Sequence, residues 1–548
     1  MTSQSRPAIK IDDHIPAAPG QEEWDVVVLG TGMGGSTAGY EVARRGGRVL
    51  FVEKGKFLHG DPLKRQITPD VGEGEEAWAA EERLIMGRWP LPVRGWSSFG
   101  DVEFYAPLGC GSGGSTIIYG GQLERFAPSD FHPREHAPDA PDASVVESWP
   151  ITYDELVPFY RRAERLFDVS GTPDPLNPDP EAALRAPPPL SERDQYLFDT
   201  FSGAGLHPYR SHVGYHKLGD CDECLDLCLR NCKSDAGRNC VVPALVDHGA
   251  SMLPECEALR LEAGRSRVDS VRVVRKGVEH SIRAKMFVLG AGSWASPVLL
   301  LRSNSSEWPD GLANSSGLVG RNLMLHTSDF LTIDQRELRS EAGPRKSMAL
   351  NDFYIDEGEK LGTLQSVGLP LIAPFIREYL RYALEKDPRW WCRFVEPRLE
   401  SVARIGERLS RRASLLSTIV EDLPYPENRV VPDPAAPNGR CFSYTYPAEL
   451  ARRSRRLLKL VRRRLGRGHR LRVVTGGRNN LNYGHVCGTC RFGDDPAESV
   501  LDRTNRAHDL DNLYLVDSSF FPSSGGINPS LTIAANALRV GEIVHGRL

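Results

Sequence analysis

The chain has 548 residues, 40% of them hydrophobic, and a formal net charge of −4 at pH 7. This length exceeds one compact domain, so we expect two closely packed domains. The small net charge excludes a general electrostatic attraction to nucleic acid or to a membrane surface. We find no apolar run long enough for a membrane-spanning helix and no signal-peptide pattern. We therefore expect a cytoplasmic protein whose 11 cysteines stay reduced unless they bind metal or do redox work.

The first patterned segment follows a polar, proline-interrupted stretch, residues 1–21, which predicts a disordered tail. The run WDVVVLGTGMGGSTAGYEVARRGGRVLFVEKG then predicts a buried strand, a glycine turn, a helix and a second strand. Gly30, Gly32 and Gly35 have G-x-G-x-x-G spacing, and Glu53 ends the second strand.

This arrangement is typical of a dinucleotide-binding turn. Gly30 permits the tight turn, Gly32 lets the backbone approach a pyrophosphate, and Gly35 lets the helix pack on the strand. The helix N-terminus stabilises phosphate charge, and Glu53 can accept hydrogen bonds from a ribose. The alternative is a glycine-rich turn without a ligand, which the flanking elements and the acid disfavour.

Three later segments carry related signals. PLGCGSGGSTIIYGG, within residues 107–126, is a second glycine loop that suits close approach to a flavin or its phosphates. HSIRAKMFVLGAGSWASPVLLLRS predicts another strand, turn and helix, with Gly290 at the strand end. NLYLVDSSFFPSSGGINPSLTIAANALRV predicts a strand, a loop holding Asp517 and Asn528, and a helix that begins near Leu531.

Other segments predict helices outside these units. Thr152 and Glu155 form a capping-box pattern at the start of a helix. Residues 340–425 show helical periodicity and predict a helix pair in a substrate domain, with an amphipathic element that docks on a membrane or partner as the alternative. The basic stretch 451–474 predicts a solvated helix face, with a binding patch as the alternative.

Taken in order, these pieces resemble the glucose–methanol–choline (GMC) oxidoreductases, FAD-dependent enzymes that oxidise alcohols. The matching stretches are VVVLGTGMGG…FVEKG, GSGGSTIIYGG, SWPITYDELVPFYRRAERLF, FVLGAGSWASPVLLLRS, GLVGRNLMLH, EDLPYPENRV and HVCGTCRFGDDP through to the C-terminal segment. Within that family, the short, cysteine-containing form is similar to bacterial members that oxidise sugar or aminoglycoside hydroxyls in secondary metabolism.

The resemblance implies an α/β fold, in which a Rossmann-like FAD-binding domain is interleaved with an α+β substrate domain of antiparallel sheet and helices. The FAD-binding domain would comprise residues 22–130, 215–335 and 480–548. The substrate-binding domain would comprise residues 131–214 and 336–479.

The resemblance also implies a catalytic pair. The family's base is a His just before a Gly-Thr pair, and HVCGTC places His485 there; its partner lies in a loop before the last helix, and GGINPSLT places Asn528 there. Asp517 and the turn Pro529–Thr532 match residues that touch the FAD pyrophosphate and the pyrimidine edge of the flavin. With the glycine loops, the implied cofactor-binding residues are Gly30, Gly32, Gly34, Gly35, Glu53, Lys54, Gly113, Gly114, Ser115, Tyr119, Gly290, Ala291, Asp517, Pro529, Leu531 and Thr532.

The chemistry of alcohol oxidation suits these two side chains. The reaction removes a hydroxyl proton and, from the same carbon, a hydride that flavin N5 accepts. An imidazole, with an ordinary pKa of about 6.5, can take the proton near neutral pH. Asn528 can donate to the developing alkoxide without carrying charge. The bland alternatives are a core histidine at His485 and a loop-capping asparagine at Asn528.

The expected function is therefore FAD-dependent oxidation of a hydroxyl to a carbonyl on a polar small molecule, such as a sugar or secondary metabolite. Oxygen or another acceptor would reoxidise the flavin. The competing functions are a flavoprotein of the same fold with lyase or reductase chemistry, and an electron-transfer subunit that works through a cysteine-ligated cluster.

Two cysteine patterns stand out against this background. Cys221, Cys224, Cys228 and Cys232 could ligate zinc or an iron–sulfur cluster, although their spacing matches neither the common ferredoxin run nor a zinc ribbon; reduced thiols or one local disulfide are the alternative. Cys487 and Cys490, beside the predicted base, are expected to be small buried side chains rather than a redox disulfide or metal ligands.

The second glycine loop contains no histidine. Some members of the family attach FAD covalently through a histidine in this loop, so we expect non-covalent FAD.

Overall fold

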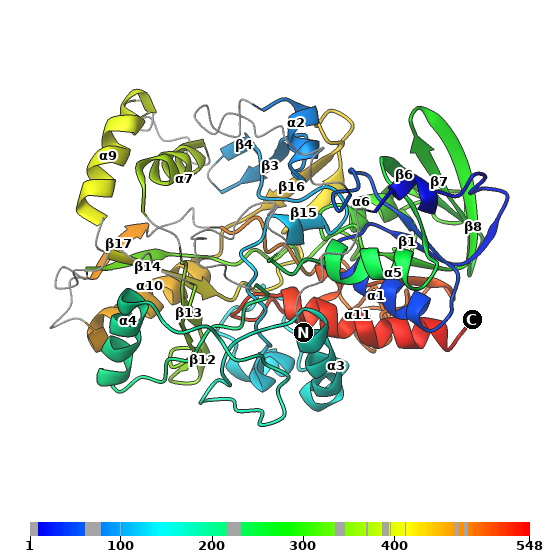
Figure 1. Ribbon diagram of the computed structural model, residues 1–548. Coiled ribbons are helices and arrows are strands. Elements are labelled where there is room, and N and C mark those ends of the chain that lie inside the picture. Colours follow the sequence, from blue (N-terminus) through cyan, green and yellow to red (C-terminus); the bar gives the residue numbers. More distant parts are fainter. Residues whose placement is uncertain are drawn as a thin grey trace.

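The structure is a computed structural model of the chain. It describes residues 9–60, 78–98, 100–215, 232–334, 346–368, 371–385, 394, 396–410, 413–465, 471–475 and 481–548. Two large β-sheets lie side by side, on the right and on the left of Figure 1, with helices packed around them.

The first sheet, on the right of Figure 1, contains the strand that precedes the glycine turn. Its strands are β1 (Glu23–Leu29), β2 (Val49–Val52), β5 (Ser251–Leu253), β6 (Cys256–Ala263), β7 (Val268–Arg275), β8 (Val278–Leu289) and β18 (Leu513–Leu515). They are ordered β5-β2-β1-β8-β7-β6, with β18 also paired to β8. β5, β2, β1, β8 and β18 run parallel, while β6 and β7 are antiparallel. The central residues of β1 are completely buried, as expected for a parallel strand covered on both faces.

Two long helices cover this sheet. α1 (Met33–Arg44) links β1 to β2, and α11 (Ser530–His545) follows β18 and packs against α1. Figure 1 shows the two helices together below the sheet. The strand–turn–helix units predicted at the start of the chain, at β8 with α6 (Ser296–Arg302), and at β18 with α11 are therefore confirmed.

The second sheet is antiparallel. Its strands are β9 (Phe330–Asp334), β10 (Ala349–Leu350), β13 (Gly362–Ser366), β14 (Ala413–Val420) and β17 (Leu471–Thr475), in the order β10-β13-β14-β9-β17. Its apolar residues share one core with α4 (Glu192–Gly203) and with α10 (Ala448–Leu465). The combination of a Rossmann-like sheet and an antiparallel sheet confirms the α/β fold that we expect from the sequence.

Smaller elements complete the fold. β15 (Arg429–Pro432), β16 (Arg440–Tyr444), β3 (Val93–Ser97) and β4 (Gly100–Phe104) form a four-stranded sheet, and β11 (Ile355–Asp356) pairs with β12 (Glu359–Lys360). The remaining α-helices are α2 (Ala80–Ile85), α3 (Tyr153–Leu166), α5 (Val242–Val246), α7 (Ala373–Glu385) and α9 (Leu399–Ser410). Single turns lie at Ile11–His14, Gly114–Ile117, Pro128–Phe131, Pro133–His136, Gly237–Val241, Glu396–Arg398 and Ser518–Phe520.

Several local predictions can be compared with these elements. Thr152 Oγ1 accepts from the Glu155 backbone N–H at 3.2 Å, and Glu155 accepts from the Thr152 N–H at 2.8 Å, so the capping box of α3 is confirmed. α7 and α9 pack as the predicted helix pair. α3 falls in the segment predicted for the substrate domain, yet it packs against α11. β9 falls in a segment predicted for the FAD-binding domain, yet it joins the antiparallel sheet. The predicted domain boundaries stay a prediction.

Arginines of the basic helix α10 form ion pairs within the protein. Arg453 is buried and pairs with Glu449 at 2.6 Å. Arg452 and Arg456 both pair with Glu359 on β12. The helix therefore offers the solvent fewer free cations than its sequence suggests.

The N-terminal segment differs from its prediction. Ile11 and Ile15 pack against the core beside a single helical turn, Ile11–His14, so residues 9–21 are not the disordered tail that we expect from their composition.

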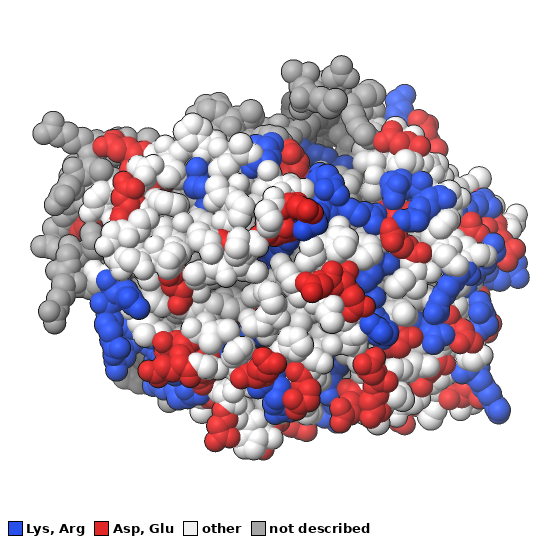
Figure 2. Space-filling model, turned by 90° about the horizontal axis from the view of Figure 1, so that it is seen from below, with Lys and Arg blue, Asp and Glu red and all other residues white. Residues whose placement is uncertain are grey.

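Within the described part of the chain, no helix combines the length and apolarity required to span a bilayer. Figure 2 shows acidic and basic side chains intermingled over the face seen from below.

Candidate active site

The carboxyl ends of the parallel strands border a cavity of about 620 Å³. Gly30 follows β1, Glu53 follows β2, Gly290 follows β8, and Asp517 lies two residues past β18; all four line the cavity. In open α/β sheets, ligands bind outside the carboxyl ends of the strands. They bind at the point where the order of the strands changes direction, beside the first strand. The sheet therefore places four of the predicted cofactor residues together.

The first glycine turn is shaped for a ligand phosphate. Gly30 has φ +93°, and a Cβ there would lie 2.6 Å from the Gly290 carbonyl oxygen, so a side chain is excluded. The Gly32 Cβ position is open, with the same oxygen, at 3.7 Å, as its nearest neighbour. Gly32 is also the N-cap of α1 and forms no side-chain cap, which leaves the first helical N–H groups available to an anion. Gly34 and Gly35 instead permit close packing, against the backbone after β18 and against Gly30.

The second glycine loop lies directly against the first. The Gly113 N–H donates to the Thr31 carbonyl at 3.0 Å. Gly114 has φ +53°, and a Cβ there would lie 2.7 Å from Gly32 Cα. Ser115 and Tyr119 follow on the cavity wall, whereas Gly113 does not line the cavity. The two loops together form one end of the cavity.

Glu53 is buried at the cavity edge. Its carboxylate accepts from the Thr31 N–H at 2.9 Å, the Thr31 hydroxyl at 2.6 Å and the Gly55 N–H at 2.9 Å. Burial raises the pKa of this carboxyl, against the lowering effect of these hydrogen bonds. The next residue, Lys54, also lines the cavity and pairs with Glu257 at 2.8 Å.

Asp517 links two loops of the cavity wall through hydrogen bonds. One carboxylate oxygen accepts from the Gly292 N–H at 2.9 Å and from the Ser296 hydroxyl at 2.5 Å, and the other accepts from the Ser519 N–H at 2.9 Å. Gly290, Ala291 and Gly292, the turn after β8, therefore sit in a fixed position on the cavity wall.

The start of α11 presents different residues from those predicted. Pro529 lines the cavity, but Leu531 and Thr532 are completely buried behind it, and Thr532 Oγ1 bonds to the Tyr160 hydroxyl at 2.7 Å. Ser530 and Ile533 reach the cavity instead. These two positions are three residues apart and share one face of a helix, a periodicity that could have found them from the sequence.

His485 and Asn528, the predicted catalytic pair, line the same cavity as the glycine turns. His485 Nδ1 lies 2.9 Å from Nδ1 of His326, whose ring stands at 88° to it. Burial first, and then the neighbouring His326 and Lys346, lower the pKa of His485 well below its ordinary value. Burial also lowers the pKa of His326, to about 4. Both rings are therefore neutral at physiological pH.

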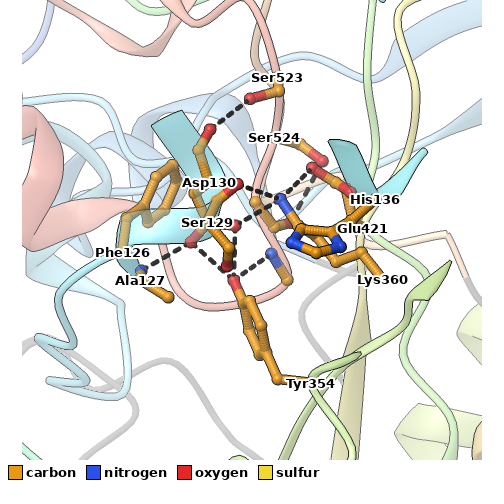
Figure 3. Close-up of polar contacts among 12 residues, drawn as sticks. Phe126, Ala127, Ser129, Asp130, His136, Tyr354, Lys360, Glu421, Ser523 and Ser524 are labelled. Atoms are coloured by element: carbon orange, nitrogen blue, oxygen red, sulfur yellow. Dashed lines mark hydrogen bonds and ion pairs between the residues drawn. The ribbon is translucent and has the colours of Figure 1, made fainter. Parts of the chain in front are cut away.

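The loop that leads to Asn528 contacts a buried polar network. Figure 3 shows this network around Asp130, with Ser523 and Ser524 of the loop beside it. The Gly526 N–H donates to the Tyr354 hydroxyl at 2.8 Å, and this hydroxyl donates to the carboxylate of Asp130. Lys360 Nζ lies 2.8 Å from Asp130 and 3.5 Å from Glu421, with both ion pairs almost completely buried. Burial lowers the pKa of Lys360, but these two carboxylates outweigh it and hold the pKa above its ordinary value.

The Asn528 side chain is 9% exposed, and its buried Oδ1 has no hydrogen-bond partner within the described residues. A ligand that fills the cavity can satisfy such a group.

The far wall of the cavity belongs to the antiparallel sheet. It is lined by Phe330 on β9, Gln365 on β13, and Ser417 and Ile419 on β14. Ser328, Lys346 and Asn482 line the cavity as well. These residues were not identified from the sequence. Lys346, Gln365, Ser417 and Ile419 come from a region without a recognisable motif, whereas Ser328, Phe330 and Asn482 lie just outside the motifs GLVGRNLMLH and HVCGTC.

Matches to known families decide the identity. Two models described as GMC oxidoreductase match residues 97–328 and 452–537, and an FAD binding domain model matches residues 25–63. The chain belongs to the GMC oxidoreductase family. It is therefore an FAD-dependent enzyme that acts on CH–OH donors, as we expect from the resemblance.

Relatives of this GMC oxidoreductase cover nearly its whole length. It is 30% identical to 6'''-hydroxyparomomycin C oxidase of Streptomyces lividus, over 96% of this chain and 92% of that protein. The same figures apply to paromamine 6'-oxidase of Streptomyces fradiae. The crystal structure of pyridoxine 4-oxidase from Mesorbium loti has the same fold, with a TM-score of 0.62 and 20% identity over 96% of this chain and 99% of that chain.

The cavity of this GMC oxidoreductase fits FAD. The open face of Gly32 and the uncapped start of α1 can hold the pyrophosphate, and Glu53 can reach a ribose at the end of β2. The cavity then continues past Ala291 and Asp517 to His485 and the antiparallel sheet.

The cysteines divide into two groups. Cys487 and Cys490 are buried free thiols whose pKa values are raised by burial, in keeping with small packed side chains. Cys221, Cys224 and Cys228 lie outside the described residues, and Cys232 is buried. Among the residues that the structure describes, no group of three or more His, Cys, Asp or Glu side chains could hold a metal ion.

Proposed function

We propose that this enzyme oxidises a hydroxyl to a carbonyl on a polar, polyhydroxylated small molecule, with His485 as the base and Asn528 as the group that orients the substrate oxygen. The observation that carries this proposal is that both side chains line the cavity that begins at the two glycine loops. Gln365, Ser417 and Asn482, which line the same cavity, supply uncharged hydrogen-bonding groups for further hydroxyls.

The two side chains divide the work at the substrate. FAD, when bound, supplies the acceptor for the hydride that leaves the carbinol carbon. His485, held neutral by burial, takes the hydroxyl proton. The Asn528 amide donates a hydrogen bond to the oxygen as negative charge develops there, and the buried loop keeps the amide in place. A positioned base of this kind accelerates such a step by about 10²–10⁴-fold.

Two further details belong to the proposal. Two relatives that are each 30% identical are named as oxidases of the aminoglycosides paromamine and 6'''-hydroxyparomomycin C, and this supports a sugar-like substrate. FAD is bound non-covalently, because residues 107–126, which contain the second glycine loop, include no histidine.

The test is an anaerobic screen. The purified enzyme is mixed with sugars, aminoglycosides and simple alcohols, and bleaching of the flavin absorbance is followed in a stopped-flow instrument. We expect polyols to bleach the flavin, and His485→Ala to retain FAD but bleach about 10²–10⁴-fold more slowly. A His485→Ala variant that reacts as fast as the wild type would show that another group is the base. Acid precipitation that leaves the yellow colour in the protein pellet would contradict non-covalent binding.

A further inference from the structure

His326 lies between the predicted base and the loop that carries Asn528. Its side chain is completely buried, and its Nε2 lies 3.1 Å from the Ser524 carbonyl oxygen and 2.9 Å from that of Gly525. A carbonyl oxygen only accepts hydrogen bonds. Nε2 of His326 must therefore carry a proton and donate it to this pair of carbonyls.

This proton determines the state of the other nitrogen. A neutral imidazole carries one N–H, so Nδ1 of His326 has a lone pair and accepts. The contact at 2.9 Å between the two Nδ1 atoms then requires that His485 be the donor. The reverse assignment would turn an unprotonated Nε2 toward two carbonyl oxygens, and an imidazolium at His326 would place a charge in a completely buried site.

The neutral His485 ring is thereby left with its only proton on Nδ1, where it points at His326. Its Nε2 has no hydrogen-bond partner among the described residues, and the ring lines the cavity. We propose that His326 is a positioning residue that fixes the tautomer of His485, so that Nε2 is the atom that receives the substrate proton. This inference rests on the proposed function of His485 as the base.

The same contact serves the base after it has reacted. When Nε2 of His485 takes the substrate proton, the ring becomes an imidazolium whose Nδ1–H already points at a neutral acceptor. A hydrogen bond from a charged donor is stronger than one from a neutral donor, so His326 stabilises the charge that forms. The charged groups that act on the pair are Lys346, which disfavours a cation at His485, and Asp130, which favours one at His326.

The carbonyls that orient His326 belong to the loop that also carries Asn528. Ser524 in this loop donates through its hydroxyl to the Asp422 carbonyl at 2.9 Å, and Gly526 is held by Tyr354. One loop therefore sets both the tautomer of the base and the place of the amide. A shift of this loop would disturb both groups together.

The direct test is the tautomer itself. In enzyme labelled with ¹⁵N-histidine, two-dimensional ¹H–¹⁵N spectra distinguish the protonated ring nitrogen from the bare one, and the His485 signals are identified by their loss in His485→Gln. We expect a proton on Nδ1 and a lone pair on Nε2 in the wild-type holoenzyme. A proton on Nε2 of the resting His485 would overturn the inference without any variant of His326.

Two variants test the consequence. In His326→Leu the acceptor is lost, and we expect FAD affinity to be kept, the rate of flavin reduction to fall by roughly 10²–10⁴-fold, and His485 to show a mixture of tautomers. In His326→Gln the amide can accept from His485 and donate to the carbonyls, so most of the rate and the single tautomer should return. A His326→Leu enzyme with the wild-type rate and tautomer would refute the positioning role.

The two proposals fail in different ways. If the proposed function is wrong, no alcohol reduces the wild-type flavin, whatever the tautomer. If only the role of His326 is wrong, the wild type is active and His485→Ala is not, but the variants at position 326 leave the tautomer unchanged.

Discussion

The buried cation behind the Asn528 loop offers a sharp test of how this active site is held. In Lys360→Met a side chain of similar length replaces the ammonium, and the carboxylates of Asp130 and Glu421 stay buried without their cation. The charged side chains of both ion pairs are at most 2% exposed, so water does not screen their attraction. Removal of one partner from a buried pair costs about 3–5 kcal/mol.

The assay has two readouts. Thermal unfolding of the holoenzyme should show a melting temperature lower by several degrees. Flavin reduction should also slow, because Asp130 holds Tyr354, which binds Gly526 in the loop that carries Asn528. Lys285→Met is the matched control: it breaks an ion pair of the same 2.8 Å length with Asp25, but at the surface, where water screens the charges, so stability should stay near that of the wild type.

A double variant separates charge from packing. Lys360→Met combined with Asp130→Asn leaves fewer uncompensated charges, and we expect it to recover part of the lost stability. If Lys360→Met melts at the same temperature as Lys285→Met, the network does not stabilise the loop and the reasoning is refuted.

Three further outcomes are expected. Gly30→Ala should lose FAD, because the new Cβ would lie 2.6 Å from the Gly290 carbonyl oxygen. Gly46→Ala is the control and should keep FAD, because Gly46 has a similar φ of +96° but no atom within 4 Å of the new Cβ. Equilibrium binding of FAD measures both variants. Asn528→Ala should keep FAD but reduce flavin about 10²-fold more slowly, and an unchanged rate would exclude the amide from catalysis. Burial lowers the pKa of His326 from about 6.5 in the unfolded chain to about 4 in the folded protein, so between these pH values the unfolded chain binds more protons. Thermal stability should therefore decline as pH falls through this range. A melting temperature that does not fall between pH 7 and pH 4 would contradict this expectation.

The parts of the site that the sequence predicts are those with a local pattern. The Gly30 turn and the strand that ends at Glu53 depend on neighbours within a few residues, so their spacing predicts them. The role of Asn528 is implied by the family resemblance and stays a prediction. His485 was found through the short motif around it. In each case the chemistry of the residue and its position in the chain point to the same place.

The parts that were missed depend on contacts between distant segments. His326 lies in GLVGRNLMLH, a stretch that supports the family resemblance, yet its contact with His485 joins residues 159 positions apart. No sequence pattern states which ring nitrogen meets which. The predicted cofactor residues Leu531 and Thr532 are buried in the core, because helical periodicity turns their side chains away from the cavity.

The order of the strands has a consequence for biosynthesis. β18 pairs with β8 and α11 packs on α1, so the flavin pocket is closed by residues 513–545, made long after the glycine turn of residues 30–35. Before these residues are made, the edge of β8 that pairs with β18 and the face of α1 that packs on α11 have no partner, and Asp517 and Asn528 do not yet exist. The cavity is therefore completed only when this last segment has been translated, and until then the unpaired strand edge and the uncovered helix face favour aggregation of the nascent chain.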